Sequence, residues 1–134
     1  MSTGRVLVVD DEADVRKAVR LTLVKAGLDV VEAEDGEKAI KEIRSADNPV
    51  MLDAIVCDIQ MPKINGLEAT AFFRKEFPSV PVIIMTGHPQ INDATELMKQ
   101  GVVDYLMKPI APEKLTEVVV KHVKEHVYKD KFRT

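Results

Sequence analysis

The chain has 134 residues, a net charge of −3, 46% hydrophobic residues and 31% charged residues. This length suits a single domain with one sizeable core, and the composition is ordinary for a globular protein. The small negative charge gives no reason to expect a general affinity for nucleic acid or for anionic lipid.

Neither the cysteine content nor the hydrophobic pattern points to secretion or to a membrane. Cys57 is the one cysteine, so it cannot form an internal disulfide, and its place in an apolar run predicts a buried structural thiol. The chain passes almost directly into a strand and shows no signal peptide. No apolar run approaches the roughly 20 residues that a bilayer span requires. We therefore expect a cytoplasmic protein without a membrane partner.

The first half of the chain alternates short apolar runs with amphipathic stretches. We expect strands at Val6–Val9, Leu28–Ala33 and Ala54–Cys57, and helices from Glu12 to Ala26 and from about Glu37 to Ser45. Asp11 can cap the first helix, and Gly27 stands where a left-handed residue belongs after a helix. Asn48-Pro49 is expected to break the second helix.

The second half repeats the alternation. The expected helices run from about Gly66 to Phe77, from about Ile91 to Gln100, and from near Pro112 past Val123, and the expected strands are Val80–Met85 and Val103–Met107. Pro78 ends the first of these helices and Gly101 the second. We take residues 1–126 as one domain and residues 127–134 as a helix extension or a frayed tail.

Five strand–helix units predict an α/β fold with a parallel sheet covered by helices on both faces. The first, third and fourth strands are nearly all apolar, as central strands should be. The strand Leu28–Ala33 carries more polar residues and suits an edge. Right-handed crossovers leave few topologies. We predict a flavodoxin-like doubly wound five-stranded sheet with strand order 2-1-3-4-5 and five helices.

Polar side chains follow the apolar runs where the strands end. They are Asp10 and Asp11 after the first strand, Asp58 after the third, Thr86 after the fourth and Lys108 after the fifth. The carboxyl ends of parallel strands share one edge, where such sheets keep their ligand sites. Two carboxylates about 4 Å apart repel by roughly 4 kcal/mol at an effective dielectric constant near 20. A proton, Lys108 or a divalent cation could compensate.

An all-oxygen cluster with few protein ligands suits Mg²⁺, which keeps several waters and often binds phosphate oxygens. A metal, a carboxylate nucleophile and a lysine also suit phosphoryl transfer. No Gly-x-x-x-x-Gly-Lys loop or Gly-x-Gly-x-x-Gly pattern is present, so a nucleotide is not expected as the phosphate donor. The simpler interpretation, that Asp10 and Asp11 only cap the first helix, leaves Asp58 and Lys108 unexplained.

Four short motifs closely resemble those of the receiver domain of two-component response regulators. They are Val8-Val9-Asp10-Asp11-Glu12, Cys57-Asp58-Ile59-Gln60-Met61-Pro62 with Gly66, Met85-Thr86-Gly87, and Asp104-Tyr105-Leu106-Met107-Lys108-Pro109. Each motif alone is weak, but all four in this order and at these spacings are highly specific. The resemblance covers the chain from Arg5 to about Val123.

The resemblance implies a chemical role for each member of the cluster. Asp58 would accept a phosphoryl group from a phosphohistidine on a sensor histidine kinase or a histidine phosphotransfer protein. Mg²⁺ would be held by Asp10, Asp11, Asp58 and the backbone carbonyl of Gln60. Lys108 would pair with Asp58 and then with the phosphoryl oxygens.

The resemblance also implies a switch. Thr86 would move to hydrogen-bond the phosphoryl group, and Tyr105 would change rotamer as it does so. The fourth helix, the fifth strand and the fifth helix would then change the surface offered to a downstream protein target. The Lys108-Pro109 peptide is expected to be cis, as is typical of this family.

Simpler interpretations stay open for several residues. Thr86 could be a β-branched strand end and Tyr105 an ordinary half-buried strand residue. His88 could be read as a phosphohistidine or a metal ligand, but an exposed loop histidine is the better interpretation. His122 and His126 are four residues apart, a spacing that can bind a metal on one helix face, but no third ligand is apparent nearby.

The leading hypothesis is a phosphorylation-controlled signalling module rather than an enzyme. One alternative is a hydrolase with an aspartyl-phosphate intermediate, which usually has a second aspartate where this chain has Gln60. Another is an interaction module that does not become phosphorylated, which would not need the complete acidic set. The sequence leaves open the kinase, the target, the input signal, a possible homodimer, and whether the chain is a stand-alone receiver or a fragment of a larger regulator.

Overall fold

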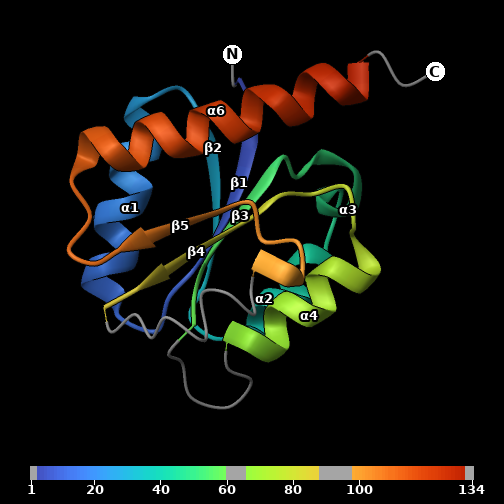
Figure 1. Ribbon diagram of the computed structural model, residues 1–134, viewed down its shortest axis with the longest axis horizontal. Coiled ribbons are helices and arrows are strands. Elements are labelled where there is room, and N and C mark those ends of the chain that lie inside the picture. Colours follow the sequence, from blue (N-terminus) through green and yellow to red (C-terminus); the bar gives the residue numbers. More distant parts are fainter. Residues whose placement is uncertain (1–2, 60–65, 88–97, 132–134) are drawn as a thin grey trace.

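The computed structural model describes residues 3–59, 66–87 and 98–131, and it shows one parallel sheet between two layers of helices (Figure 1). The strands are β1 (Arg5–Val9), β2 (Asp29–Ala33), β3 (Ala54–Asp58), β4 (Val82–Thr86) and β5 (Asp104–Met107). The helices are α1 (Ala13–Lys25), α2 (Gly36–Ile43), α3 (Asn48–Met51), α4 (Gly66–Glu76) and α6 (Pro112–Lys131). The strand order is β2-β1-β3-β4-β5. The predicted doubly wound fold and its order are confirmed.

The core lies on both faces of the sheet because successive strand residues point to opposite sides. In β1, Val6 and Val8 pack into the core beneath α1 and α6. Leu7 and Val9 pack into the core beneath α2 and α4. All four side chains are fully buried. Burial of each such side chain stabilises the fold by roughly 1.5–3 kcal/mol. The central strands are therefore firmly anchored, and so are the residues at their ends.

The start of α1 differs from the prediction. The N-cap residue is Glu12, not Asp11, and its side chain makes no capping hydrogen bond. Asp11 therefore stands one residue before the N-cap position. By contrast, α2 has the expected kind of cap, because the carboxylate of Asp35 accepts a hydrogen bond from the backbone N–H of Lys38 at 2.8 Å. Gly27 has a positive φ of 93°, as predicted for the residue after α1.

The segment that follows α2 is also more ordered than predicted. α2 ends at Ile43, before Asn48-Pro49 is reached, and Asn48-Pro49 begins the four-residue helix α3. Proline fits the first turn of a helix because no N–H is required there. The buried side chain of Asn48 donates a hydrogen bond to the backbone carbonyl of Glu42 at 2.8 Å. Asn48 therefore bonds to the last turn of α2 and is also the first residue of α3.

Other boundaries moved by a few residues. β4 begins at Val82 rather than Val80, since Pro81 has no N–H to donate to the sheet. The helix expected at 91–100 lies mostly outside the described residues, and its described end is helical at residues 98–99. Gly101 has the positive φ, 97°, expected after that helix. At the other end of the domain, α6 continues to Lys131.

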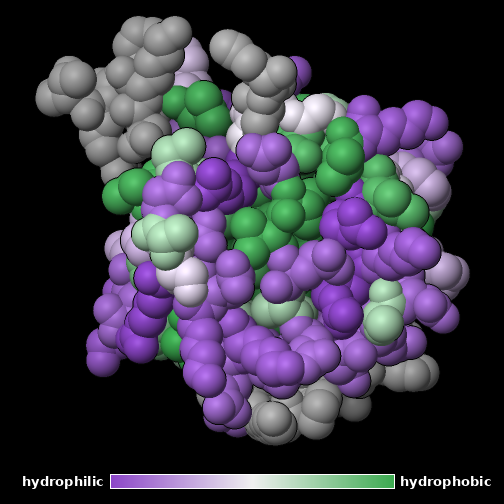
Figure 2. Space-filling model, turned by 180° about the vertical axis from the view of Figure 1, so that it is seen from behind, coloured by the Kyte–Doolittle hydropathy of each residue, from purple (hydrophilic) through white to green (hydrophobic). Residues whose placement is uncertain are grey.

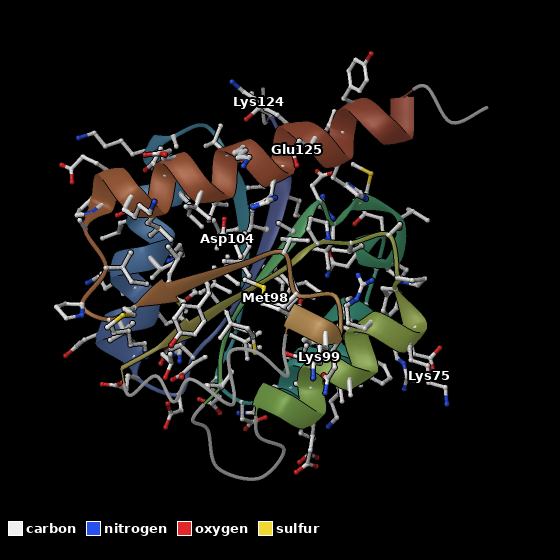
Figure 3. All side chains as sticks on the ribbon, viewed as in Figure 1. Lys75, Met98, Lys99, Asp104, Lys124 and Glu125 are labelled. Atoms are coloured by element: carbon white, nitrogen blue, oxygen red, sulfur yellow. The ribbon has the colours of Figure 1, made fainter. Side chains whose placement is uncertain are left out.

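Two histidines tie α6 to the sheet at the amino ends of its strands. His126 Nδ1 lies 2.9 Å from Asp53 Oδ1, just before β3. His122 Nε2 lies 3.1 Å from Asp104 Oδ2, at the start of β5. Figure 3 shows Asp104 beneath α6. The second oxygen of each aspartate accepts a hydrogen bond from a backbone N–H, that of Arg5 for Asp53 and that of Tyr105 for Asp104.

The face shown in Figure 2 is mostly hydrophilic, although hydrophobic side chains are visible across its middle. Leu21 and Val24 of α1 and Val50 of α3 are among the exposed large hydrophobic residues. Within the described ranges, no helix combines the length and the apolar character that crossing a membrane would need.

Candidate functional site

The acidic residues of the site come from two neighbouring central strands. Asp58 is the last residue of β3, and Asp10 directly follows β1. Val9 pairs with Cys57 across these strands, so the two aspartates lie side by side at the carboxyl edge. Both side chains are almost completely buried, at 0% exposure for Asp10 and 4% for Asp58. Two carboxylates held this close and this deep require a positive charge beside them.

Lys108 supplies that charge. It follows β5 and reaches over the end of β4 to the acidic pair. Its Nζ atom lies 2.7 Å from Asp10 Oδ2 and 3.0 Å from Asp58 Oδ2. Alternation along the strands explains the meeting, because Asp10, Asp58 and Lys108 are each two residues beyond a residue of the core beneath α1 and α6. The Lys108-Pro109 peptide is cis, as expected.

The main chain at Asp10 is held from several sides. Its N–H donates to the carbonyl of Ala33 at 3.2 Å. Its carbonyl accepts a hydrogen bond from Arg16 Nη1 of α1 at 2.7 Å. Its carboxylate oxygen Oδ1 accepts one from the backbone N–H of Glu12 at 2.8 Å. The carboxylate is therefore fixed in orientation, with Oδ2 turned toward Lys108.

Burial and the ion pairs act in opposite directions on the charges of the site. Burial raises the pKa of Asp10 above its ordinary value, and the hydrogen bond and charge of Lys108 only partly reverse this. Burial lowers the pKa of Lys108, but the hydrogen bonds and charges of Asp10 and Asp58 together outweigh it and raise the pKa overall. Lys108 is therefore a permanent cation, whereas burial disfavours the charged form of Asp10.

The donor atoms of the site fit a hard divalent cation. Carboxylate oxygens of Asp10, Asp11, Glu12 and Asp58 lie within 4.8 Å of one another. Asp10 Oδ2 is buried and lies 2.7 Å from the Lys108 ammonium, and a carboxylate oxygen can accept from a second partner as well. An oxygen with spare acceptor capacity, in a cluster of oxygen donors only, is suited to Mg²⁺. The backbone carbonyl of Gln60, the remaining predicted ligand, lies outside the described residues.

Thr86 and Tyr105 lie near the cluster but on the other face of the sheet. Thr86 is the fully buried last residue of β4, two residues beyond Ile84. Ile84 belongs to the core beneath α2 and α4, and Tyr105 of β5, which pairs with it, is partly buried and packs against that core. Thr86 and Tyr105 therefore share one face of adjacent strands. His88, the other histidine considered for this edge, lies outside the described residues.

Sequence reasoning missed the part played by Glu12. Glu12 Oε1 lies 3.3 Å from Lys108 Nζ, which makes it the third carboxylate around the ammonium. The signal was present, since three consecutive acidic residues follow β1. Pattern reasoning stopped at Asp10 and Asp11 because a glutamate at the start of a helix is common for reasons of helix polarity alone.

A parallel sheet of this order, with acidic residues and a lysine at its carboxyl edge, defines a receiver-like α/β protein. A family model described as the response regulator receiver domain matches residues 6–120. The chain belongs to that family. Its α6 helix continues past the end of the match.

Relatives and solved structures agree with this assignment. The chain is 34% identical over 132 residues to the hybrid signal transduction histidine kinase I of Dictyostelium discoideum, covering 95% of this chain and 8% of that protein. It is 32% identical over 128 residues to the transcriptional regulatory protein YrkP of Bacillus subtilis, covering 95% of this chain and 53% of that protein. The receiver domain protein from Clostridium thermocellum superposes with a TM-score of 0.84 at 26% identity, covering 98% of this chain and 99% of that one.

The chain thus spans a small part of the first relative and about half of the second. What it shares with them is the receiver domain, a regulatory phospho-acceptor domain rather than an enzyme in the ordinary sense.

Proposed function

We propose that this domain is a phosphoryl-accepting switch of a two-component phosphorelay, with Asp58 as the acceptor. The observation that carries the proposal is the position of the Lys108 ammonium, 3.0 Å from Asp58 and 2.7 Å from Asp10, at the carboxyl edge of the sheet. A carboxylate is a competent nucleophile when nearby cations neutralise the charge that develops on the group it attacks.

In the proposed reaction, a carboxylate oxygen of Asp58 attacks the phosphorus of a phosphohistidine on the donor. A phosphorus–oxygen bond forms, the phosphorus–nitrogen bond breaks, and the electron pair returns to the imidazole, which takes a proton from solvent. Water later attacks the acyl phosphate, releasing inorganic phosphate and restoring the carboxylate. Lys108 stays beside the transferred group throughout because its ammonium already contacts the acceptor.

The proposed metal is Mg²⁺, held by Asp10, Asp11, Asp58 and the backbone carbonyl of Gln60. When bound, it would offset the charge of the carboxylates and of the phosphoryl oxygens. The support is the set of oxygen donors within 4.8 Å of one another and the spare acceptor capacity of Asp10 Oδ2.

The proposed switch uses Thr86 and Tyr105. Moving an equilibrium from 1:99 to 99:1 requires about 5.5 kcal/mol of differential interaction. Hydrogen bonds to charged groups contribute roughly 1.5–3 kcal/mol each. Thr86 and Lys108 acting together on a phosphoryl group could supply most of that shift, and Tyr105, on the same face as Thr86, would carry it to the β5 edge.

The proposed donor is a sensor histidine kinase or a histidine phosphotransfer protein. The proposed output is contact with a downstream protein through the surface of β5, α6 and the helix before β5, with a homodimer as a further possibility. Relatives named as a hybrid kinase and a transcriptional regulatory protein suggest that this module serves different outputs in different chains.

The test is incubation with acetyl phosphate and Mg²⁺, followed by intact mass measurement. The wild type should gain one phosphoryl group, and Asp58→Asn should gain none. Asp14→Asn, which removes an exposed carboxylate from the first turn of α1, is the matched control and should behave as wild type. A wild type that stays unmodified, or an Asp58→Asn protein that gains the same mass, would contradict the proposal.

A further inference from the structure

The first turn of α1 presents a side chain that does not serve its helix. Glu12 is the N-cap residue, with extended backbone angles (φ −87°, ψ 108°), and its side chain makes no capping hydrogen bond. Aspartate, asparagine or serine would stabilise a helix better at this position. Since the side chain is not used by the helix, the contact that it does make is informative.

That contact is with Lys108. Glu12 Oε1 lies 3.3 Å from Lys108 Nζ. An ammonium group has three donors, and within the described residues the carboxylates of Asp10, Asp58 and Glu12 lie around this one. Asp10 and Asp58 are buried, whereas the Glu12 side chain is 62% exposed. Glu12 therefore holds the ammonium from the solvent side.

The same side of the site opens into a groove of about 460 Å³ whose lining includes Glu12, Gly87 and Lys108. Val15 and Ala18 of α1 and Ile110 add apolar walls. A small anionic donor that approaches Lys108 along this groove would meet the carboxylate of Glu12, which opposes it, and the ammonium of Lys108, which attracts it.

We propose that Glu12 is a positioning residue for Lys108, and that it slows phosphorylation because the ammonium must give up its contact with Glu12 before it can turn to the oxygens of the incoming phosphoryl group. The inference rests on the proposed function of Asp58. When the phosphoryl group bonds to Asp58, Lys108 gives up its contact with Glu12 and turns to the new oxygens. Weakening that contact favours the phosphorylated state.

Two variants separate the contact from the charge. Glu12→Gln removes the charge and weakens the hydrogen bond. Glu12→Asp keeps the charge but shortens the side chain, and aspartate at an N-cap turns toward its own helix. Asp14→Asn removes the same charge from the same turn of α1 without a contact to Lys108, and serves as the control.

The experiment measures the initial rate of phosphorylation by acetyl phosphate with Mg²⁺, from intact mass, in all four proteins. Acetate leaves with the electron pair of the broken phosphorus–oxygen bond as the bond to Asp58 forms. Glu12→Gln and Glu12→Asp should each react about two- to fivefold faster than wild type, the factor that one exposed ion pair is worth. Asp14→Asn should match the wild type.

A second readout reports on Lys108 itself. The NMR signals of its side-chain methylene next to Nζ, recorded without a phosphate donor, should shift in both Glu12 variants and stay in place in Asp14→Asn. Positioning is overturned if Glu12→Asp keeps the wild-type rate and signals, or if Asp14→Asn accelerates as much as Glu12→Gln. A wild type that takes up no phosphoryl group counts against the proposed function, and the NMR signals then decide the role of Glu12 separately.

Discussion

Asp10 Oδ2 lies 2.7 Å from Lys108 Nζ, which joins the end of β1 to the end of β5 across two intervening strands. Asp10 has no exposed surface, and the Lys108 side chain is 14% exposed. A buried ion pair of this kind is weak evidence for stability, because taking both charges out of water offsets much of their attraction. We interpret the pair as part of a binding site for further charged groups.

The first prediction follows from the burial of Asp10. Its pKa is raised mainly by burial, so folding disfavours its charged form and this part of the stability falls as pH rises through the raised pKa. At pH 7 and without a divalent cation, Asp10→Asn should therefore stabilise the protein, by about 1 kcal/mol. Urea unfolding measures this difference.

Added Mg²⁺ should reverse the ranking. Wild type would gain stability as binding favours the folded state, and Asp10→Asn would gain much less. An Asp10→Asn protein that is less stable than wild type without metal, or that gains as much from Mg²⁺, would show that Asp10 is an ordinary structural residue.

The second prediction concerns the switch. Thr86→Ala should still become phosphorylated at Asp58, because Lys108 and the acidic residues are unchanged. The conformational response should weaken, because the hydroxyl that would bond the phosphoryl group is missing. Amide NMR shifts of residues 98–107, with and without acetyl phosphate, measure the conformational response.

Thr70→Ala, which changes another fully buried threonine, controls for the loss of a hydroxyl and should respond fully. Equal responses in Thr86→Ala and wild type would remove Thr86 from the switch.

The third prediction compares two glycines with nearly equal φ, Gly27 at 93° and Gly101 at 97°. Alanine at either position costs roughly 1–2 kcal/mol because of the left-handed backbone. At Gly101 the added Cβ would also lie 2.8 Å from Nε of Arg74, whereas at Gly27 the nearest such atom, Thr3 Oγ1, is 3.8 Å away. Gly101→Ala should therefore be the more destabilising of the two in urea unfolding.

We attribute the larger expected loss of stability in Gly101→Ala to Arg74. Its Nε donates to the carbonyl of Gln100 at 3.2 Å and its Nη1 to that of Pro78 at 2.9 Å, and a displaced guanidinium would lose both bonds. In an Arg74→Ala background the difference between the two glycine variants should shrink. A difference of the same size in both backgrounds would mean that Arg74 is not its cause.

The fourth prediction concerns pH and the anchor of α6. Burial raises the pKa of Asp104, but the hydrogen bonds from the Tyr105 N–H and from His122 outweigh it, and the pKa is lowered from 3.8. A lowered pKa contributes stability that is present above about pH 4 and is lost as pH falls through the folded-state value. Asp104→Asn should cost less than about 1 kcal/mol at pH 5, since the carboxylate is a third exposed.

The cost of Asp104→Asn should fade as the pH is lowered toward 2.5. Asp29→Asn, at the exposed start of the other edge strand, is the matched control. Thermal unfolding at a series of pH values checks both. A cost that stays constant with pH would assign the effect of Asp104 to packing rather than to charge.

Much of the candidate site could be predicted because of where parallel strands end. Asp58 closes a strand whose five residues are all buried, and such a strand can only be central. The parallel strand β1 beside it brings Asp10 to the same edge, and β5, which lies beyond β4, brings Lys108 there. The cap by Asp11 was predicted wrongly and the short helix α3 was not predicted, because at a helix end or in a single turn one residue decides which hydrogen bond forms.

The sequence by itself determined the strands and the longer helices, reduced the strand orders to a few, and determined the edge at which the acidic residues gather, since these follow from hydrophobic periodicity and from the handedness of crossovers. Only the tertiary structure decided which side chains touch. The contact of Glu12 with Lys108, and those of His122 and His126 with aspartates of distant strands, join segments far apart in the chain. Short-range patterns carry no record of such contacts, because they depend on side-chain direction and on which groups are already bonded when the layers pack together.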